Sequence, residues 1–181
     1  MTSAKSYATE GRLDDLIDRA GPVAADISIP DIKTTGTKAI TFLTIPGGTV
    51  HGSEEYQGKA LGAFSTSATP GSITFTVFQD GVGSATLASL VVPAAGLWNG
   101  AGNAGWRVYF EVFYISSTEA WVYLELKWHT AAGAGGSVAW FTVQDNTVGA
   151  TDTDKDLTLA AGFTGTGLTL VTGAGKIERK G

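Results

Sequence analysis

The sequence predicts an all-β protein, a sandwich or barrel of about eight to ten antiparallel strands behind a short N-terminal helical arm. From residue 38 onward, short β-rich segments follow one another with turn signals roughly every 8–15 residues and without an intervening helical pattern. Only 16% of the 181 residues are charged, and small residues, including 25 glycines, take their place. This composition is typical of many short strands joined by small-residue turns.

Residues 1–36 differ from the rest of the chain and are predicted to form an N-terminal arm. Thr9 can cap a helix over about residues 9–20, which Gly21 and Pro22 would end. Four apolar side chains recur in it at helical spacing: Leu13, Leu16, Ile17 and Ala20. Because so short a helix is marginal in water, its apolar stripe is expected to pack either on its own domain or on another protein chain.

Residues 37–181 are predicted to form one β domain. Its expected strands, in chain order, cover residues 39–45, 58–65, 72–78, 84–92, 106–114, 120–128, 137–143, 156–163, 168–172 and 176–179. Turn-forming residues separate several of them, such as Pro46 and Gly47 after the first strand and Asp80 and Gly81 before the fourth.

The strongest strand signal is a long hairpin over residues 106–129. One face of its two strands is apolar throughout: Trp106, Val108, Phe110, Val112 and Tyr114, then Ala120, Val122, Leu124, Leu126 and Trp128. If the loop over residues 116–118 sets the register, Phe110 lies opposite Leu124. A slip by one residue would set Phe110 against Glu125, so the register is expected to be well determined.

The other face of this hairpin mixes aromatic and charged side chains. The aromatic ones are Tyr109, Phe113, Trp121 and Tyr123, and the charged ones are Arg107, Glu111, Glu125 and Lys127. Such a face is too apolar to be fully wetted and too polar to be a dry core, and a mixture of this kind is typical of subunit interfaces. Two other interpretations stay open: a second core layer covered by loops, or a platform for a ligand.

Four motifs of the domain resemble a family of bacteriophage virion jelly-roll domains. They are a Gly-led strand at residues 58–65, a Thr-rich alternating strand at 72–78, the Trp106-Arg107 pair that opens the longest strand, and Asp156-Leu157-Thr158-Leu159 near the end. The resemblance covers residues 38–180 and implies a jelly roll of about eight strands that is usually trimeric and decorates a capsid or forms a head or tail appendage. The last strand departs from the family pattern, because it is Gly-rich and ends in the charged segment 176–180. Its register is left open.

Charge and composition argue against several partners. The net charge is −5, and the 12 Lys and Arg residues are spread along the chain, whereas nucleic-acid binding needs clustered cations that neutralise phosphates. No run approaches the ~20 apolar residues that span a bilayer, and the chain does not open with the pattern of a signal peptide. Without cysteine, neither a disulfide nor a cysteine-ligated metal is expected.

No combination of residues points to catalysis, so neither enzyme activity nor a cofactor is expected. His51 and His129 lack a second ligand at metal-binding spacing, and Glu54 and Glu55 are neighbours that would point to opposite faces of a strand. One acidic cluster is formed by Asp152, Asp154 and Asp156. Alternate Asp residues in a loop can ligate Ca²⁺, but the glycine and glutamate of an EF-hand are missing. A solvated loop and a Ca²⁺ site are both left open.

Together with these patterns, the resemblance implies a jelly-roll β-sandwich that serves as a structural subunit on the outer surface of a phage head. The residues predicted at a homotrimer interface are Tyr109, Phe113, Trp121 and Tyr123. The residues predicted to dock on the major capsid protein, and so to stabilise the head, are Leu13, Leu16 and Ile17. The alternative is a head or tail appendage that binds a host-surface glycan or receptor. Of the five tryptophans, only Trp98 in a loop and Trp121 on the mixed face lie outside the predicted core, which makes Trp98 the candidate ligand contact.

Overall fold

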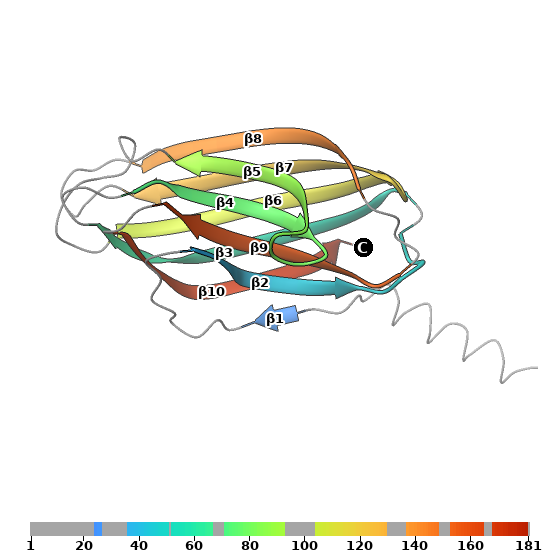
Figure 1. Ribbon diagram of the computed structural model, residues 1–181, viewed down its shortest axis with the longest axis horizontal. Coiled ribbons are helices and arrows are strands. Elements are labelled where there is room, and N and C mark those ends of the chain that lie inside the picture. Colours follow the sequence, from blue (N-terminus) through green and yellow to red (C-terminus); the bar gives the residue numbers. More distant parts are fainter. Residues whose placement is uncertain are drawn as a thin grey trace, which may run out of the picture.

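The computed structural model describes residues 24–26, 36–50, 52–66, 71–92, 104–129, 137–148, 153–164 and 168–180. These residues form two antiparallel β-sheets that pack face to face (Figure 1). The strand order of the six-stranded sheet is β1 (Ala24–Asp26), β10 (Leu168–Lys180), β3 (Glu54–Thr66), β6 (Ala104–Ser116), β7 (Glu119–His129) and β8 (Ser137–Thr147). The strand order of the four-stranded sheet is β2 (Gly36–Ile45), β9 (Lys155–Phe163), β4 (Ile73–Gln79) and β5 (Ala85–Val92). The prediction of an all-β sandwich is confirmed.

Strands that are far apart in the sequence lie side by side in both sheets. β10, the last strand, pairs with β3, and β9 pairs with both β2 and β4. Several connections lead from one sheet to the other, as from β2 to β3 and from β8 to β9. Crossovers of this kind are typical of jelly-roll sandwiches. They bring distant parts of the chain onto one surface.

The hairpin of β6 and β7 adopts the predicted register. Phe110 lies opposite Leu124. The turn is shorter than the predicted three residues, because Ser116 already pairs with Glu119. A one-residue irregularity in β6 next to the turn compensates for this difference. The two apolar faces therefore still coincide.

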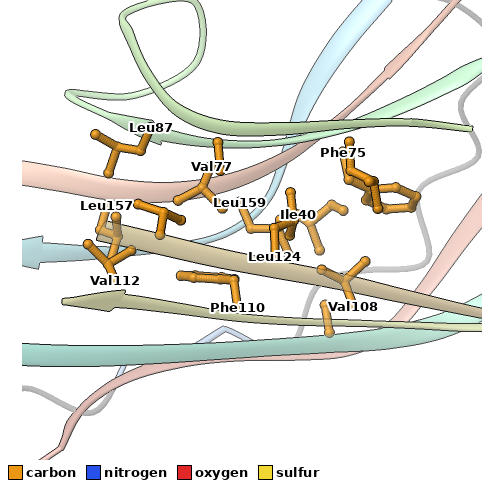
Figure 2. Packing of buried hydrophobic residues seen from close by; sticks show 14 of the residues in the cluster. Ile40, Phe75, Val77, Leu87, Val108, Phe110, Val112, Leu124, Leu157 and Leu159 are labelled. Atoms are coloured by element: carbon orange, nitrogen blue, oxygen red, sulfur yellow. The ribbon is translucent and has the colours of Figure 1, made fainter. Parts of the chain in front are cut away.

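The core lies between the sheets and is built largely on the predicted apolar face of the hairpin. All ten side chains of that face, from Trp106 to Trp128, are at most 2% exposed. Trp106 lies opposite Trp128 and donates a hydrogen bond from its indole Nε1 to the carbonyl oxygen of Ala63 at 3.1 Å. Figure 2 shows residues of β6 and β7 facing residues of the four-stranded sheet, among them Phe75, Val77, Leu87, Leu157 and Leu159.

Several strands differ from the prediction, among them β3, which begins at Glu54 and not at residue 58. β10 is one strand where two short ones were expected, because its two halves are separated only by a bulge between Thr172 and Ala174. The register that the sequence left open places Ile177 opposite Gly58. β1 lies within the predicted arm and pairs with β10, and the sequence pattern missed it because three residues show no periodicity. β8 continues to Thr147, into a segment that was expected to be a loop.

The predicted helix over residues 9–20, with Leu13, Leu16 and Ile17, lies outside the described residues. That prediction is therefore not tested. Within the described ranges, no helix is long and apolar enough to cross a bilayer.

Candidate functional site

The outer face of the six-stranded sheet carries the mixture of aromatic and charged side chains that the sequence predicted. Because side chains alternate along β6 and β7, the residues between the core positions lie on this face. Phe113 lies opposite Trp121, and their side chains are 43% and 51% exposed. The rings of Tyr109 and Tyr123 lie with their centroids 6.3 Å apart, inclined at 60°. The structure thus brings the four predicted interface residues onto one surface.

An apolar residue that the sequence analysis missed adds to this surface. Val143 of β8 lies opposite Tyr123 and is 59% exposed. Its place depends on the pairing of β8 with β7, which no sequence motif revealed. We call Phe113, Trp121, Tyr123 and Val143 the aromatic patch. Together with Glu111 and other neighbours, they line a shallow depression of about 260 Å³.

Beside the aromatic patch, glutamates of the outer face pair with lysines. The ammonium Nζ of Lys180 lies 2.5 Å from Oε1 of Glu55 and 2.7 Å from Oε1 of Glu111. Glu178 pairs with Lys176 on the same strand. We call these five residues the charged ladder, which crosses β10, β3 and β6. Each of its carboxylates has a cationic partner.

Two tyrosines connect the aromatic patch to glutamates. Tyr109 donates its hydroxyl to Glu111, and Tyr123 donates to Oε2 of Glu125 at 2.9 Å. Burial and the hydrogen bond to Glu111 raise the pKa of Tyr109 to about 12, and burial and the bond to Glu125 raise the pKa of Tyr123. Conversely, hydrogen bonds from Lys180 and Tyr109 hold the pKa of Glu111 below its ordinary value. At neutral pH the tyrosines are therefore neutral donors and Glu111 is an ionised acceptor.

A second depression, of about 270 Å³, lies over β3, β6 and β7. We call it the basic depression, and its lining residues are Lys59, Arg107, Tyr109, Glu125 and Lys127. Nζ of Lys127 lies 2.7 Å from Oε1 of Glu125. Lys59 and Arg107, in contrast, have no ion-pair partner among the described residues. The hollow therefore contains two cations that no described carboxylate neutralises by direct contact.

Two aspartates of the predicted acidic cluster accept hydrogen bonds from the end of β2 and from the turn that follows it. Oδ1 of Asp154 accepts a hydrogen bond from the backbone N–H of Gly47 at 2.8 Å, and Oδ1 of Asp156 accepts one from Oγ1 of Thr44 at 2.6 Å. Across the ranges that the structure describes, no group of three or more His, Asp or Glu residues is placed to hold a metal ion.

The remaining candidates do not come together. His129 is the last residue of β7, and Glu54 and Glu55 occupy successive positions of β3, so their side chains leave opposite faces of the sheet as predicted. Outside the described residues lie His51, Trp98 and Asp152.

No protein-family model matches the chain, and no curated protein matches it. Three solved structures illustrate the matches in shape. The lectin from Bauhinia forficata in complex with GalNAc has a TM-score of 0.40 at 10% identity, over 88% of this chain and 99% of that one. Lectin UEA-II complexed with galactose has a TM-score of 0.42 at 8% identity, and the match covers 87% of this chain and 91% of that one. The CBM2 module of the evolved Dit of Lactobacillus casei BL23 phage J-1 has a TM-score of 0.30 at 14% identity, and the match covers 88% of this chain and 80% of that one. The resemblance to phage virion jelly-roll domains stays a prediction.

Proposed function

We propose that this chain is a non-catalytic structural subunit of a bacteriophage particle, which forms a homotrimer through the aromatic patch and decorates the outer surface of the head. The observation that carries the proposal is the exposure of Phe113, Trp121 and Val143 on one face of the sheet. Large apolar side chains that gather on an exposed surface mark a place where another molecule binds. The resemblance of residues 38–180 to phage jelly rolls supports a second copy of the chain as that molecule.

The polar part of the same face also suits burial between copies. Covering an isolated charge is unfavourable, whereas a charge that is paired and hydrogen-bonded can be covered at much lower cost. Glu55 and Glu111 are both paired with Lys180. The hydroxyls of Tyr109 and Tyr123 already have acceptors. A neighbouring copy on the aromatic patch would therefore cover satisfied polar groups.

The N-terminal arm is the part that we assign to the capsid. β1, which belongs to the predicted arm, pairs with β10 at the edge of the six-stranded sheet. Leu13, Leu16 and Ile17 would supply an apolar contact with the major capsid protein. A subunit that binds the assembled head, and not its separate parts, stabilises the head by mass action.

Analytical ultracentrifugation of the purified chain tests the trimer. The wild type is expected to sediment as a trimer and Trp121→Ala as a monomer, because the variant loses a large aromatic side chain of the interface. Phe42→Ala is the matched control, since Phe42 is 49% exposed but lies on the four-stranded sheet. A wild type that is monomeric at high concentration, or a Phe42→Ala variant that dissociates like Trp121→Ala, contradicts the trimer.

Co-sedimentation with undecorated phage heads tests the docking. The wild type is expected to pellet with the heads and to raise the temperature at which they release DNA. The triple variant Leu13→Ser, Leu16→Ser and Ile17→Ser is expected to remain trimeric and to stay in the supernatant. Wild-type protein that stays in the supernatant, or a triple variant that pellets as the wild type does, contradicts the docking role.

A second candidate function is glycan or receptor binding at the same face. Trp121 is half exposed beside a depression that also contains hydrogen-bonding groups, and an exposed indole can lie against the apolar face of a sugar ring. This function predicts a wild-type monomer that binds on a glycan array and a Trp121→Ala variant that does not. Trp98, the other candidate contact, lies outside the described residues.

A further inference from the structure

We propose that the basic depression is a binding site for the carboxylate of an acidic saccharide. The site is separate from the aromatic patch, and it does not require the trimer. The depression has a volume of about 270 Å³, slightly below the roughly 300 Å³ at which sites for drug-sized ligands begin. This space suits one sugar residue of a chain whose neighbours lie along the open surface.

The two unpaired cations identify the chemistry of the ligand. Lys59 of β3 lies opposite Tyr109 of β6, so Lys59 and Arg107 are diagonal neighbours, with α-carbons roughly 7–8 Å apart. A carboxylate placed between them can accept hydrogen bonds from both. The planar guanidinium of Arg107 suits such a group particularly well, because it can donate two parallel hydrogen bonds.

Two carboxylates interact electrostatically with these cations, Glu125 of the lining with Arg107 and Glu178 with Lys59, but each is held by closer partners. Glu125 is held by Lys127 at 2.7 Å and by the hydroxyl of Tyr123 at 2.9 Å. Glu178 is held by Lys176. The positive charges of Lys59 and Arg107 are therefore the ones available to a ligand. The net charge of −5 belongs to the whole chain, and salt screens the effect of those charges that lie far from the depression.

Tyr109 gives the depression an aromatic wall that is already in position. Its hydroxyl donates to Glu111, which is itself held by Lys180 at 2.7 Å. Its ring lies against that of Tyr123, with centroids 6.3 Å apart. A side chain fixed in this way loses little freedom when a ligand binds, which favours binding.

The position of the depression favours a saccharide over a peptide strand. β3, β6 and β7 are each paired on both sides, so their backbone groups have no free edge here. A peptide cannot add to this surface as a further strand. Recognition depends on side chains alone, and these provide one aromatic ring and several hydrogen-bond donors.

The depression borders the surface that we assign to the trimer, because Tyr109 lines it and is also one of the residues predicted at the interface. Arg107 precedes Phe113 by six residues on β6, which corresponds to roughly 20 Å along the strand. Binding in the depression needs no residue of a second copy, so a monomeric Trp121→Ala variant is expected to keep the site. Failure of the trimer and failure of this site are thus separate outcomes.

Isothermal titration with trigalacturonate and with its fully methyl-esterified form tests the proposal, since esterification keeps the sugar chain and removes the negative charge of each carboxylate. The acid is expected to bind at least roughly tenfold more tightly than the ester, and more weakly as salt is added. Arg107→Gln and Lys59→Gln are each expected to lower the affinity about tenfold or more. Lys155→Gln is the matched control, because Lys155 pairs with Asp80 away from the depression, and this variant is expected to bind as the wild type does.

Several results would overturn the proposal. One is equal binding of the acid and the ester, and another is unchanged binding by Arg107→Gln and Lys59→Gln when circular dichroism shows both folded. If triaspartate or inorganic phosphate binds as tightly as trigalacturonate, the site serves an acidic peptide or a simple anion instead, and the saccharide is excluded. Trp121→Ala is expected to keep the wild-type affinity, which separates this site from the trimer interface.

Discussion

Gly58 of β3 lies directly opposite Phe110 of β6, and the ring of Phe110 occupies the space that a side chain at Gly58 would need. A β-carbon at Gly58 would lie 2.1 Å from Cε1 and 2.2 Å from Cζ of that ring. Both residues are buried. The absence of a side chain on β3 thus makes room for an aromatic ring in the core, in a cross-strand pair that tolerates no added atom.

Gly58→Ala is therefore expected to lower the free energy of unfolding by about 1–3 kcal/mol, since overpacking forces ring and backbone apart. Urea unfolding measures it. Gly175→Ala is the control on the neighbouring strand, where the nearest atom, Cβ of Thr41, would be 3.2 Å away, and a smaller loss is expected. In the double variant with Phe110→Leu, the loss should be less than the sum of the two single losses. Additive losses would show that the ring and the β-carbon do not interact.

Val143→Lys is expected to abolish the proposed trimer without unfolding the chain, because it introduces a charge into the aromatic patch while the side chain points to solvent. The change in unfolding free energy should stay within about 0.5 kcal/mol. Val91→Lys is the matched control: Val91 is 54% exposed, but it lies on β5 in the other sheet. Light scattering measures the mass of both variants. A Val143→Lys variant that remains trimeric would show that the patch lies outside the interface.

Tyr109 is expected to ionise near pH 12, since burial and the hydrogen bond to Glu111 raise its pKa to about 12. Absorbance at alkaline pH, as a difference from Tyr109→Phe, isolates this residue. Glu111→Gln should lower the pKa towards, but not down to, the ordinary value of about 10, because burial is the larger cause and remains. Ionisation of Tyr109 near pH 10 in the wild type would contradict the observed environment.

The charged ladder is expected to lose its contribution to stability in acid. Hydrogen bonds from Lys180 and Tyr109 hold the pKa of Glu111, and those from Lys176 and Gln57 hold the pKa of Glu178, below the unfolded value of about 4.3. Their contribution is therefore complete above that pH and is lost as the pH falls through the lower folded-state values. Glu111→Gln should flatten the decrease in the free energy of unfolding between pH 5 and 3, measured by urea unfolding, by less than about 1 kcal/mol because the group is partly exposed.

Glu119→Gln serves as the control for this titration, because Glu119 begins β7 beside the hairpin turn and lies outside the charged ladder. Its acid profile should follow that of the wild type more closely than the profile of Glu111→Gln does. Identical profiles for wild type and Glu111→Gln would contradict a role of the ladder in stability.

Alternation along the hairpin was enough to predict which side chains of β6 and β7 face the core and which face outward. It also predicted the pairing of Phe110 with Leu124, because a slip by one residue would bury charges. The four aromatic residues of the outer face followed from the same argument. These properties are local, since they depend on residues joined by one short turn.

The partners of those residues depend on pairing between distant strands. Lys180 meets Glu55 and Glu111 across separations of 125 and 69 residues. Likewise, Gly58 receives the ring of Phe110 only because β3 lies beside β6. No short pattern encodes such contacts, because they follow from the packing of the whole sandwich and not from the conformation of either segment. The alternation of residues therefore determined the faces of the strands, and the tertiary structure alone decided which charges on those faces are paired.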